Sequence, residues 1–224
     1  MSEEIREMAA DDRPAPRAKY LAGLAEYERP GRSLAAGLDP RERLLRAAIS
    51  VFAARGFSGA TVMGIIGEAQ TAFRTFYEYF ETKDDCFRAV FDLAEARLRE
   101  RLDLAGEKGA DPRERLRSML AELLRFVRQE SDFARLLLTA ARSASLAERL
   151  RREELMEELG RQLLSGASGK AGRDIASFIA RGVMGSIEAL LCGRLRTLEE
   201  GESEGQLLLS MYHFVLLYVG HEVA

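Results

Sequence analysis

Apolar residues recur at intervals of three and four along most of the chain, which is the spacing of one face of an α-helix. The segment 83–105 shows this spacing clearly, with Phe87, Val90, Phe91, Ala94 and Leu98. The segments 40–54 and 112–129 carry the same pattern. No run alternates apolar and polar residues for long enough to form a strand, so the pattern predicts an all-α protein.

Signals for helix starts divide this pattern into separate elements. The hexapeptide Asp-Pro-Arg-Glu-Arg-Leu occurs at 39–44 and again at 111–116. In each copy we expect Asp to cap the helix, Pro to occupy its first position and Glu to reach back to the cap. Pairs of Thr82 with Asp85 and of Ser145 with Glu148 predict two more starts. The combined signals predict nine helices, at 40–54, 62–69, 72–78, 83–105, 112–129, 132–143, 146–164, 173–197 and 204–221.

Proline and charge suggest the domain organisation. Four of the five prolines fall in the first forty residues, so we expect 1–38 to be a mobile extension. We expect residues 39–86 to form a first helical domain and residues 87–224 a second. The net charge is +2 for residues 40–83 and −3 for residues 84–224. This mild asymmetry slightly favours contact with DNA by the first domain.

The composition excludes several classes of protein. Two cysteines rule out a disulfide framework and leave too few thiols for a Cys-based zinc site, and no cluster of histidines and carboxylates surrounds the two histidines. No nucleophile and base can be paired, so we predict no catalytic residue, no metal and no cofactor. The longest apolar run, 207–219, is shorter than the ~20 residues of a membrane span. The N-terminus is acidic, unlike a signal peptide, and we expect a cytoplasmic protein that is not an enzyme.

The short predicted helices 62–69 and 72–78 resemble a helix-turn-helix unit, whose second helix fits the major groove of DNA. Spacing alone also fits other small helical bundles. A first run, Ala-Ala-x-x-x-Phe-x-x-x-Gly-Phe, consists of Ala47, Ala48, Phe52, Gly56 and Phe57. A second run consists of Thr75, Phe76, Tyr77, Tyr79, Phe80, Lys83, Cys86 and Phe87. With these runs, residues 41–92 resemble the N-terminal domain of TetR-family (tetracycline-repressor-like) transcriptional regulators.

The resemblance implies a helical C-terminal domain and a set of DNA contacts. The implied contact residues are Thr61, Phe73, Arg74, Thr75, Tyr77, Tyr79 and Lys83. Thr61 and Lys83 match positions that contact phosphates, which set register without reading sequence. Arg74 is the base-reading candidate, because a guanidinium can bridge O6 and N7 of guanine. Without the resemblance, a solvated surface charge is the better interpretation of Arg74.

The chain departs from the family pattern at the turn between the two short helices. The family has Ala-Gly-Val-Ser-x-Gly where this chain has Ala69-Gln70-Thr71-Ala72-Phe73-Arg74. Gln70 replaces a glycine in left-handed conformation, which strains other residues. Either Thr71 caps the second helix or the turn shifts by one residue. This departure keeps open an alternative function, a helical ligand-binding or scaffolding protein with a degenerate DNA-binding head.

The last two predicted helices favour self-association. Helix 204–221 is apolar nearly all round, and helix 173–197 carries small residues that permit close approach. The predicted dimer interface consists of Gly182, Gly185, Ala189, Gly193, Leu207, Met211, Phe214 and Tyr218. Apolar residues of the middle helices are candidates for a ligand pocket, namely Met119, Phe126, Phe133, Met156, Phe178 and Met184. We therefore expect a homodimeric repressor of a palindromic operator that responds to a small apolar or amphipathic effector.

Overall fold

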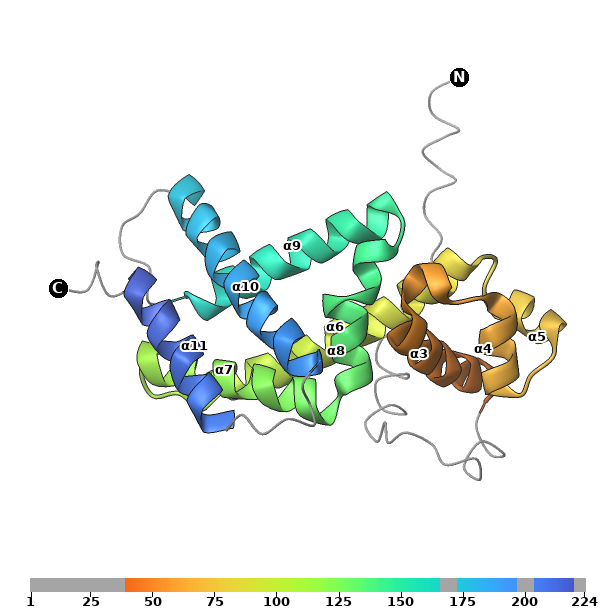
Figure 1. The fold of residues 1–224 in the computed structure, drawn as a ribbon, viewed down its shortest axis with the longest axis horizontal. Helices are drawn as coiled ribbons and strands as arrows, with labels where there is room; N and C mark the ends of the chain where they lie inside the picture. Colours follow the sequence, from red (N-terminus) through yellow and green to blue (C-terminus); the bar gives the residue numbers. More distant parts are fainter. Residues whose placement is uncertain (1–38, 166–172, 197–203, 220–224) are drawn as a thin grey trace, which may run out of the picture. The chain divides into compact units, whose positions relative to one another are not determined.

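The computed structural model describes residues 39–165, 173–196 and 204–219 (Figure 1). The expected extension, 1–38, lies outside these residues. All regular structure in the described ranges is helical, which confirms the all-α prediction. The described residues belong to one compact unit, Gly37–Ala224. None of the helices in these ranges is long and apolar enough to cross a membrane.

The first part of this unit, the head, contains α3 (Pro40–Gly59), α4 (Val62–Ala69), α5 (Phe73–Tyr79) and the start of α6 (Lys83–Glu107). Its core is aromatic, and the ring of Phe87 meets those of Phe52 and Phe57 edge-on at 5.0 and 5.2 Å. Gly56 has a positive φ of 66° and interrupts α3. Glycine adopts this conformation without steric cost. The helix predicted at 40–54 is thus broken near its expected end, but α3 continues beyond the break to Gly59.

The two copies of the hexapeptide differ in how they cap their helices. Asp111 caps α7 as predicted, accepting hydrogen bonds from the N–H groups of residues 113 and 114 at 2.8 and 2.9 Å. Asp39 makes no such bond, because its backbone (φ −54°, ψ 139°) differs from that of Asp111 (φ −135°, ψ 167°). Glu42 pairs with Arg46 instead of reaching back. The prediction is therefore wrong for the first copy.

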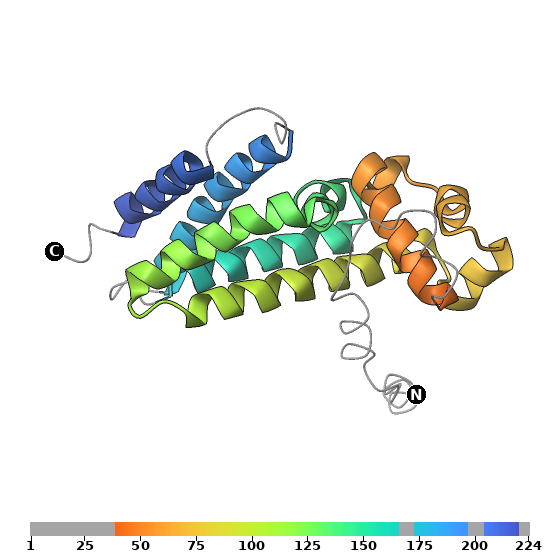
Figure 2. The same cartoon turned by 90° about the horizontal axis from the view of Figure 1, so that it is seen from below.

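The second part, the bundle, contains α6, α7 (Pro112–Gln129), α8 (Ser131–Leu138), η2 (Ala140–Ser143), α9 (Leu146–Leu163), α10 (Arg173–Arg196) and α11 (Glu204–Val219). Figure 2 shows α6, α7 and α9 running alongside one another. The single helix predicted at 132–143 is wrong. The backbone of Thr139 (φ −123°, ψ −50°) leaves the helical region, and its hydroxyl donates to the carbonyl of Arg135 at 2.7 Å.

The head packs directly on the bundle through α3, which contacts α8 and η2. The hydroxyl of Ser58 donates to the carbonyl of Ser143 at 3.2 Å. On the other side, Nε of Arg88 donates to the carboxylate of Glu148 at 3.0 Å. Glu148 lies in the first turn of α9 and is almost completely buried. Specific hydrogen bonds therefore join α3 to η2 and α6 to α9.

Candidate functional site

The turn between α4 and α5 keeps a left-handed residue although glycine is absent. Gln70 has φ 50° and ψ 46°, and its N–H points to the carbonyls of Gly67 and Ile66. The next N–H, of Thr71, donates to the carbonyl of Ile66 at 3.2 Å. The turn has thus not shifted by one residue. Gln70 bears the steric cost of a conformation that favours glycine.

The other expected compensation, a cap by Thr71, is also absent. The N-cap of α5 is Ala72, whose side chain cannot accept a hydrogen bond. Oγ1 of Thr71 is buried and has no hydrogen-bond partner among the described residues. Such a buried hydroxyl lowers stability by about 1–3 kcal/mol. The turn therefore preserves its geometry at a measurable cost in stability.

Helix α5 divides its side chains between core and solvent. Phe76 and Phe80, the residue that follows α5, are buried. The opposite side, which we call the α5 face, consists of Phe73, Arg74, Tyr77 and Tyr79. The Arg74 side chain is 91% exposed and pairs with Glu78 at 3.0 Å. Because exposed ion pairs contribute little, this guanidinium is available to another partner at small cost.

The rings of the α5 face are exposed in spite of their size. Phe73 is 55%, Tyr77 46% and Tyr79 39% exposed. Phe73 and Tyr77 contact each other, with ring centroids 4.7 Å apart. Thr75, the remaining predicted contact residue on α5, is half-buried. The face thus joins a contiguous apolar surface to a cation and two phenol hydroxyls.

Thr61 stands at the start of α4, where its Oγ1 accepts a hydrogen bond from the N–H of Gly64 at 3.0 Å. Arg55 lies beside it: a Cβ built on Gly64 would be 3.2 Å from Oγ1 of Thr61 and 3.4 Å from Nη1 of Arg55. Both residues are exposed. Helix N-termini favour anions, and an arginine adds charge. Arg55 was not predicted as a contact residue. Its position one residue before the helix break at Gly56 is the feature of the sequence that could have indicated it.

Lys83, the other predicted phosphate contact, is engaged inside the head. Its Nζ donates to the carbonyl oxygens of Phe57 and Ala60 at 2.9 and 3.1 Å. It also lies 4.2 Å from the centroid of the Phe57 ring. Lys83 therefore fastens the first turn of α6 to the segment that leads into Thr61. An ammonium has three N–H groups, so a phosphate contact by Lys83 stays a prediction.

The neighbouring thiol of Cys86 is buried beneath α3. Burial raises its pKa to about 12, and the charge of Arg41 only partly opposes this effect. The thiol is therefore protonated near neutral pH and unreactive as a nucleophile. Cys86 therefore acts as a small apolar residue of the core.

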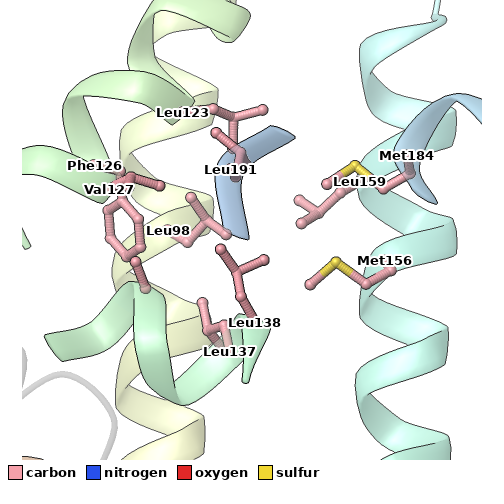
Figure 3. A pocket seen from close by; sticks show the side chains of 11 residues that line it. Leu98, Leu123, Phe126, Val127, Leu137, Leu138, Met156, Leu159, Met184 and Leu191 are labelled. Atoms are coloured by element: carbon pink, nitrogen blue, oxygen red, sulfur yellow. The ribbon is translucent and has the colours of Figure 1, made fainter. Parts of the chain in front are cut away.

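The bundle contains an apolar cavity, shown from close by in Figure 3. Its free volume is about 20 Å³, roughly the space of one water molecule. The lining residues are Leu98, Leu123, Phe126, Val127, Ala134, Leu137, Leu138, Met156, Leu159, Met184 and Leu191. A ligand larger than water can enter only if the surrounding helices move.

The six predicted pocket residues divide into three groups. Phe126, Met156 and Met184 line the cavity. Met119 and Phe133 are buried but are not among its lining residues. The placement of Phe178 in a pocket is wrong, since its side chain is 73% exposed on α10. Its helix turns the opposite side, with Val183 and Ile187, towards the core.

A second, open hollow lies between α9 and α10, with a volume of about 360 Å³. Met156 and Met184 line this groove as well as the cavity. The groove also carries charged side chains, including Arg152 and Glu188. The two methionines therefore separate an apolar interior from a polar opening.

The outer side of α10 is open, as predicted for a contact surface. Gly182, Gly185 and Ala189 are exposed, and Gly193 is half-buried. A Cβ added to any of these three glycines would meet no atom within 4 Å. Another helix can thus approach the backbone closely. Gly182, Gly185 and Ala189 are thus not covered by the described residues of this chain.

Helix α11 corrects part of the predicted interface. Leu207 and Met211 are buried within the protein, because α11 packs its inner side on α7. Phe214 is half-buried, and the side chain of Tyr218 lies outside the described residues. Leu209 and Leu217 are instead 51% and 70% exposed. We give the name α10–α11 face to the exposed residues Phe178, Gly182 and Gly185 of α10 and Leu209 and Leu217 of α11, of which Gly185 also borders the groove between α9 and α10.

Comparison with known proteins places these features in context. Residues 44–90 match the family of bacterial regulatory proteins, tetR family. The chain is 34% identical over 106 residues to the HTH-type transcriptional repressor NicS of Pseudomonas putida. That alignment covers 44% of this chain and 47% of NicS, so the chain spans about half the length of this curated relative.

Solved structures match over a greater length. A TetR-like transcriptional regulator from Rhodococcus sp. RHA1 is 27% identical, with a TM-score of 0.63, and the match covers 80% of this chain and 96% of that one. FadR from Bacillus subtilis, a transcriptional regulator solved in complex with stearoyl-CoA, is 18% identical with a TM-score of 0.63. Its match covers 77% of this chain and 96% of FadR, and it shows a shared fold.

Proposed function

Because the chain belongs to the TetR family of bacterial regulatory proteins, we propose that it is a cytoplasmic DNA-binding transcriptional regulator and not an enzyme. In this proposal it is a repressor that binds a palindromic operator as a homodimer and releases it on binding an effector. The observation that carries the proposal is the α5 face, where large rings and Arg74 are exposed on the second helix of a helix-turn-helix unit.

The proposed DNA contacts divide into two kinds. Arg74 reads a guanine through O6 and N7, while Phe73 and the tyrosines contact thymine methyl groups. Thr61, the N-cap of α4, and Arg55 of α3, whose guanidinium lies nearby, bind a phosphate together with the free N–H groups of α4. The remaining N–H of Lys83 reaches a second phosphate. Thr75 and the hydroxyl of Tyr77 complete the contact surface.

The proposed dimer forms through the α10–α11 face. A helical dimer binds half-sites about one turn of DNA apart, ~34–36 Å, and therefore needs a fixed separation of its two α5 helices. The open glycines of α10 and the exposed leucines of α11 support a close, apolar contact between copies.

The proposed effector is a small apolar or amphipathic molecule that enlarges the bundle cavity. FadR binds an amphipathic molecule of this kind, stearoyl-CoA, on the same fold. Leu98 of α6 lines the cavity, and Lys83 at the start of α6 holds the segment before Thr61. A shift of α6 would therefore change the position of the head and weaken operator binding.

The alternative is a ligand-binding or scaffolding protein whose head no longer binds DNA. The strained Gln70 and the unsatisfied Thr71 hydroxyl favour it, because both depart from the family pattern. Against it, the left-handed turn is kept and α5 still exposes its rings. The balance supports a head that binds DNA.

Selection of bound sequences from a random duplex library tests the proposal with the purified full chain. We expect enrichment of an inverted repeat whose half-sites lie about one helical turn apart. Arg74→Ala serves as the matched control and should reduce the enrichment. If neither protein enriches any sequence, the alternative function is correct.

A further inference from the structure

Arg152 is a charged residue in the interior of the bundle, only 9% exposed. Its Nε donates to the carbonyl of Leu137 at 3.0 Å, and its Nη2 pairs with the carboxylate of Glu188 on α10. Leu137 lines the apolar cavity, while Arg152 and Glu188 line the groove. Burying charge is costly unless it is paired, and Glu188 supplies the paired charge for Arg152 beside the apolar cavity.

The ion pair stands at the entrance from groove to cavity. Met156 follows Arg152 by one turn of α9, and Met184 precedes Glu188 by one turn of α10. In Figure 3 these methionines lie across the cavity from Leu123 and Phe126. Methionine is flexible and fits irregular shapes, so the two side chains can separate around a ligand. A chain that passes between them has hydrocarbon contacts ahead of it and Arg152 behind it.

The surroundings of the ion pair select the sign of the ligand charge. Glu188 has a second cation, Nη1 of Arg142, at 3.6 Å, and the Arg142 side chain is 65% exposed. If an anion takes the place of Glu188 on Arg152, Glu188 keeps Arg142 and every charge stays paired. A cation that takes Glu188 would leave Arg152 buried with only a carbonyl as acceptor, which is unfavourable.

We propose that the groove and the cavity form one effector site for an elongated apolar molecule that ends in a carboxylate. The carboxylate binds Arg152 in place of Glu188, and the apolar part passes between Met156 and Met184 into the cavity. Glu153, Glu154 and Glu157 also border the groove, together with the guanidinium of Arg181. Glu153 and Glu154 are exposed, so water and salt screen their repulsion, and Arg181 offsets part of the repulsion from the half-buried Glu157. The regulatory consequence rests on the proposed function, while binding itself does not.

Three eight-carbon probes, octanoate, octylamine and 1-octanol, test the ligand class with the full chain. Calorimetry and thermal unfolding are expected to show that octanoate binds and stabilises most, 1-octanol less, and octylamine least. The neutral alcohol measures the contribution of the apolar part alone. An order in which octylamine equals or exceeds octanoate overturns the proposal, and so does equal binding of all three probes.

Glu188→Gln gives the sharper test, because it removes the internal competitor of the ligand. We expect it to lower the dissociation constant of octanoate about tenfold, the low end for a hydrogen bond to a charged group, and to leave 1-octanol unchanged. Glu153→Gln removes a charge from the same groove without touching Arg152, and it should have little effect. Equal effects of the two variants would indicate general electrostatics and overturn the exchange of partners.

Arg152→Gln is expected to abolish the preference for octanoate over 1-octanol, provided that circular dichroism shows a native fold. If this variant does not fold, Glu188→Gln still decides the question. Binding is measured without DNA, which separates the two proposals. Octanoate that binds wild type but leaves DNA affinity unchanged supports the site and contradicts effector-controlled repression.

Discussion

The α5 face and the α10–α11 face both expose large apolar side chains, yet their chemistry differs. On the α5 face, Phe73 and Tyr77 are 55% and 46% exposed and lie next to the freely accessible Arg74. On the α10–α11 face, Phe178 and Leu217 are 73% and 70% exposed, and α10 carries open glycines. The α5 face combines rings with hydrogen-bond donors, and the α10–α11 face combines apolar side chains with bare backbone.

This difference indicates which partner each surface suits. Rings beside a guanidinium match the mixed polar and apolar edges of the major groove. Glycine and leucine lack donors for such edges, but they allow helices to pack closely and remove apolar surface from water. The exposed apolar residues mark both faces as contact surfaces. The residues beside them indicate the partner, which is DNA for the α5 face and protein for the α10–α11 face.

The largest expected effect comes from Gly185→Glu on the α10–α11 face. In a two-fold dimer the same patch of both copies meets, so the substitution brings like charges together. We expect the dimer dissociation constant to rise at least about a hundredfold, measured by analytical ultracentrifugation. Gly67→Glu on α4, an equally open helical position, should leave it unchanged. A wild-type chain that sediments as a monomer at micromolar concentration would contradict the proposed interface.

Arg74→Ala should have the next largest effect, and only on DNA. Loss of a bidentate contact to guanine costs about 1–3 kcal/mol on the selected operator and much less on random duplex. Fluorescence anisotropy with both duplexes measures the difference. Dimer dissociation should not change, which separates the α5 face from the α10–α11 face. Parallel losses on both duplexes would make Arg74 a phosphate contact and leave base reading to Phe73, Thr75 and Tyr77.

Lys83→Ala is expected to weaken binding to all sequences about equally. Loss of one phosphate contact per half-site lowers the slope of log affinity against log salt by roughly one unit for each half-site. The melting temperature should also fall, because the carbonyls of Phe57 and Ala60 lose their donor. A lower melting temperature with an unchanged salt slope would instead mean that Lys83 only positions the segment before Thr61.

Much of the head could be predicted from sequence because its signals are local. Thr82 and Asp85 form the predicted capping box, with reciprocal hydrogen bonds of 3.1 and 3.0 Å. Glycine at 56 predicted the end of the first helix close to the observed break, for a steric reason that needs no tertiary contact. The two identical hexapeptides show the limit of such signals. The φ and ψ angles of the two Asp residues differ, and only Asp111 caps its helix with its side chain.

The bundle was less predictable because its decisive contacts are long-range. Helix α11 is apolar all round, so its sequence cannot say that Met211 turns inward on α7 and Leu209 outward. Phe178 was assigned to a pocket from its residue type alone, although α10 directs it to the surface. Likewise, nothing in the sequence pairs Arg152 with Glu188, which are brought together only by the packing of α9 on α10.

The smallest expected effect is a difference in alkylation between the two cysteines, one of which lies in the head and the other in the bundle. Cys86 is buried in the head, whereas Cys192 is half-buried in a hollow on α10 beside Gly185 and Ala189. At pH 8 iodoacetamide should modify Cys192 and spare Cys86 in the folded protein, as mass spectrometry of tryptic peptides can show. If the partner protomer covers this hollow, Gly185→Glu should accelerate modification of Cys192 and leave Cys86 protected.

The same thiol gives a pH test of the head core. The pKa of Cys86 is raised from 9.0 to about 12 by burial, so below pH 9 the thiol is protonated in both the folded and the unfolded chain. Above pH 9 only the unfolded chain loses the proton, which favours unfolding by up to about 1.4 kcal/mol per pH unit. Urea unfolding at pH 8, 9 and 10 should therefore show wild type losing its stability advantage over Cys86→Ala as pH rises. Parallel losses in the two proteins would mean that Cys86 titrates normally and that water reaches the interface of α3 and α6.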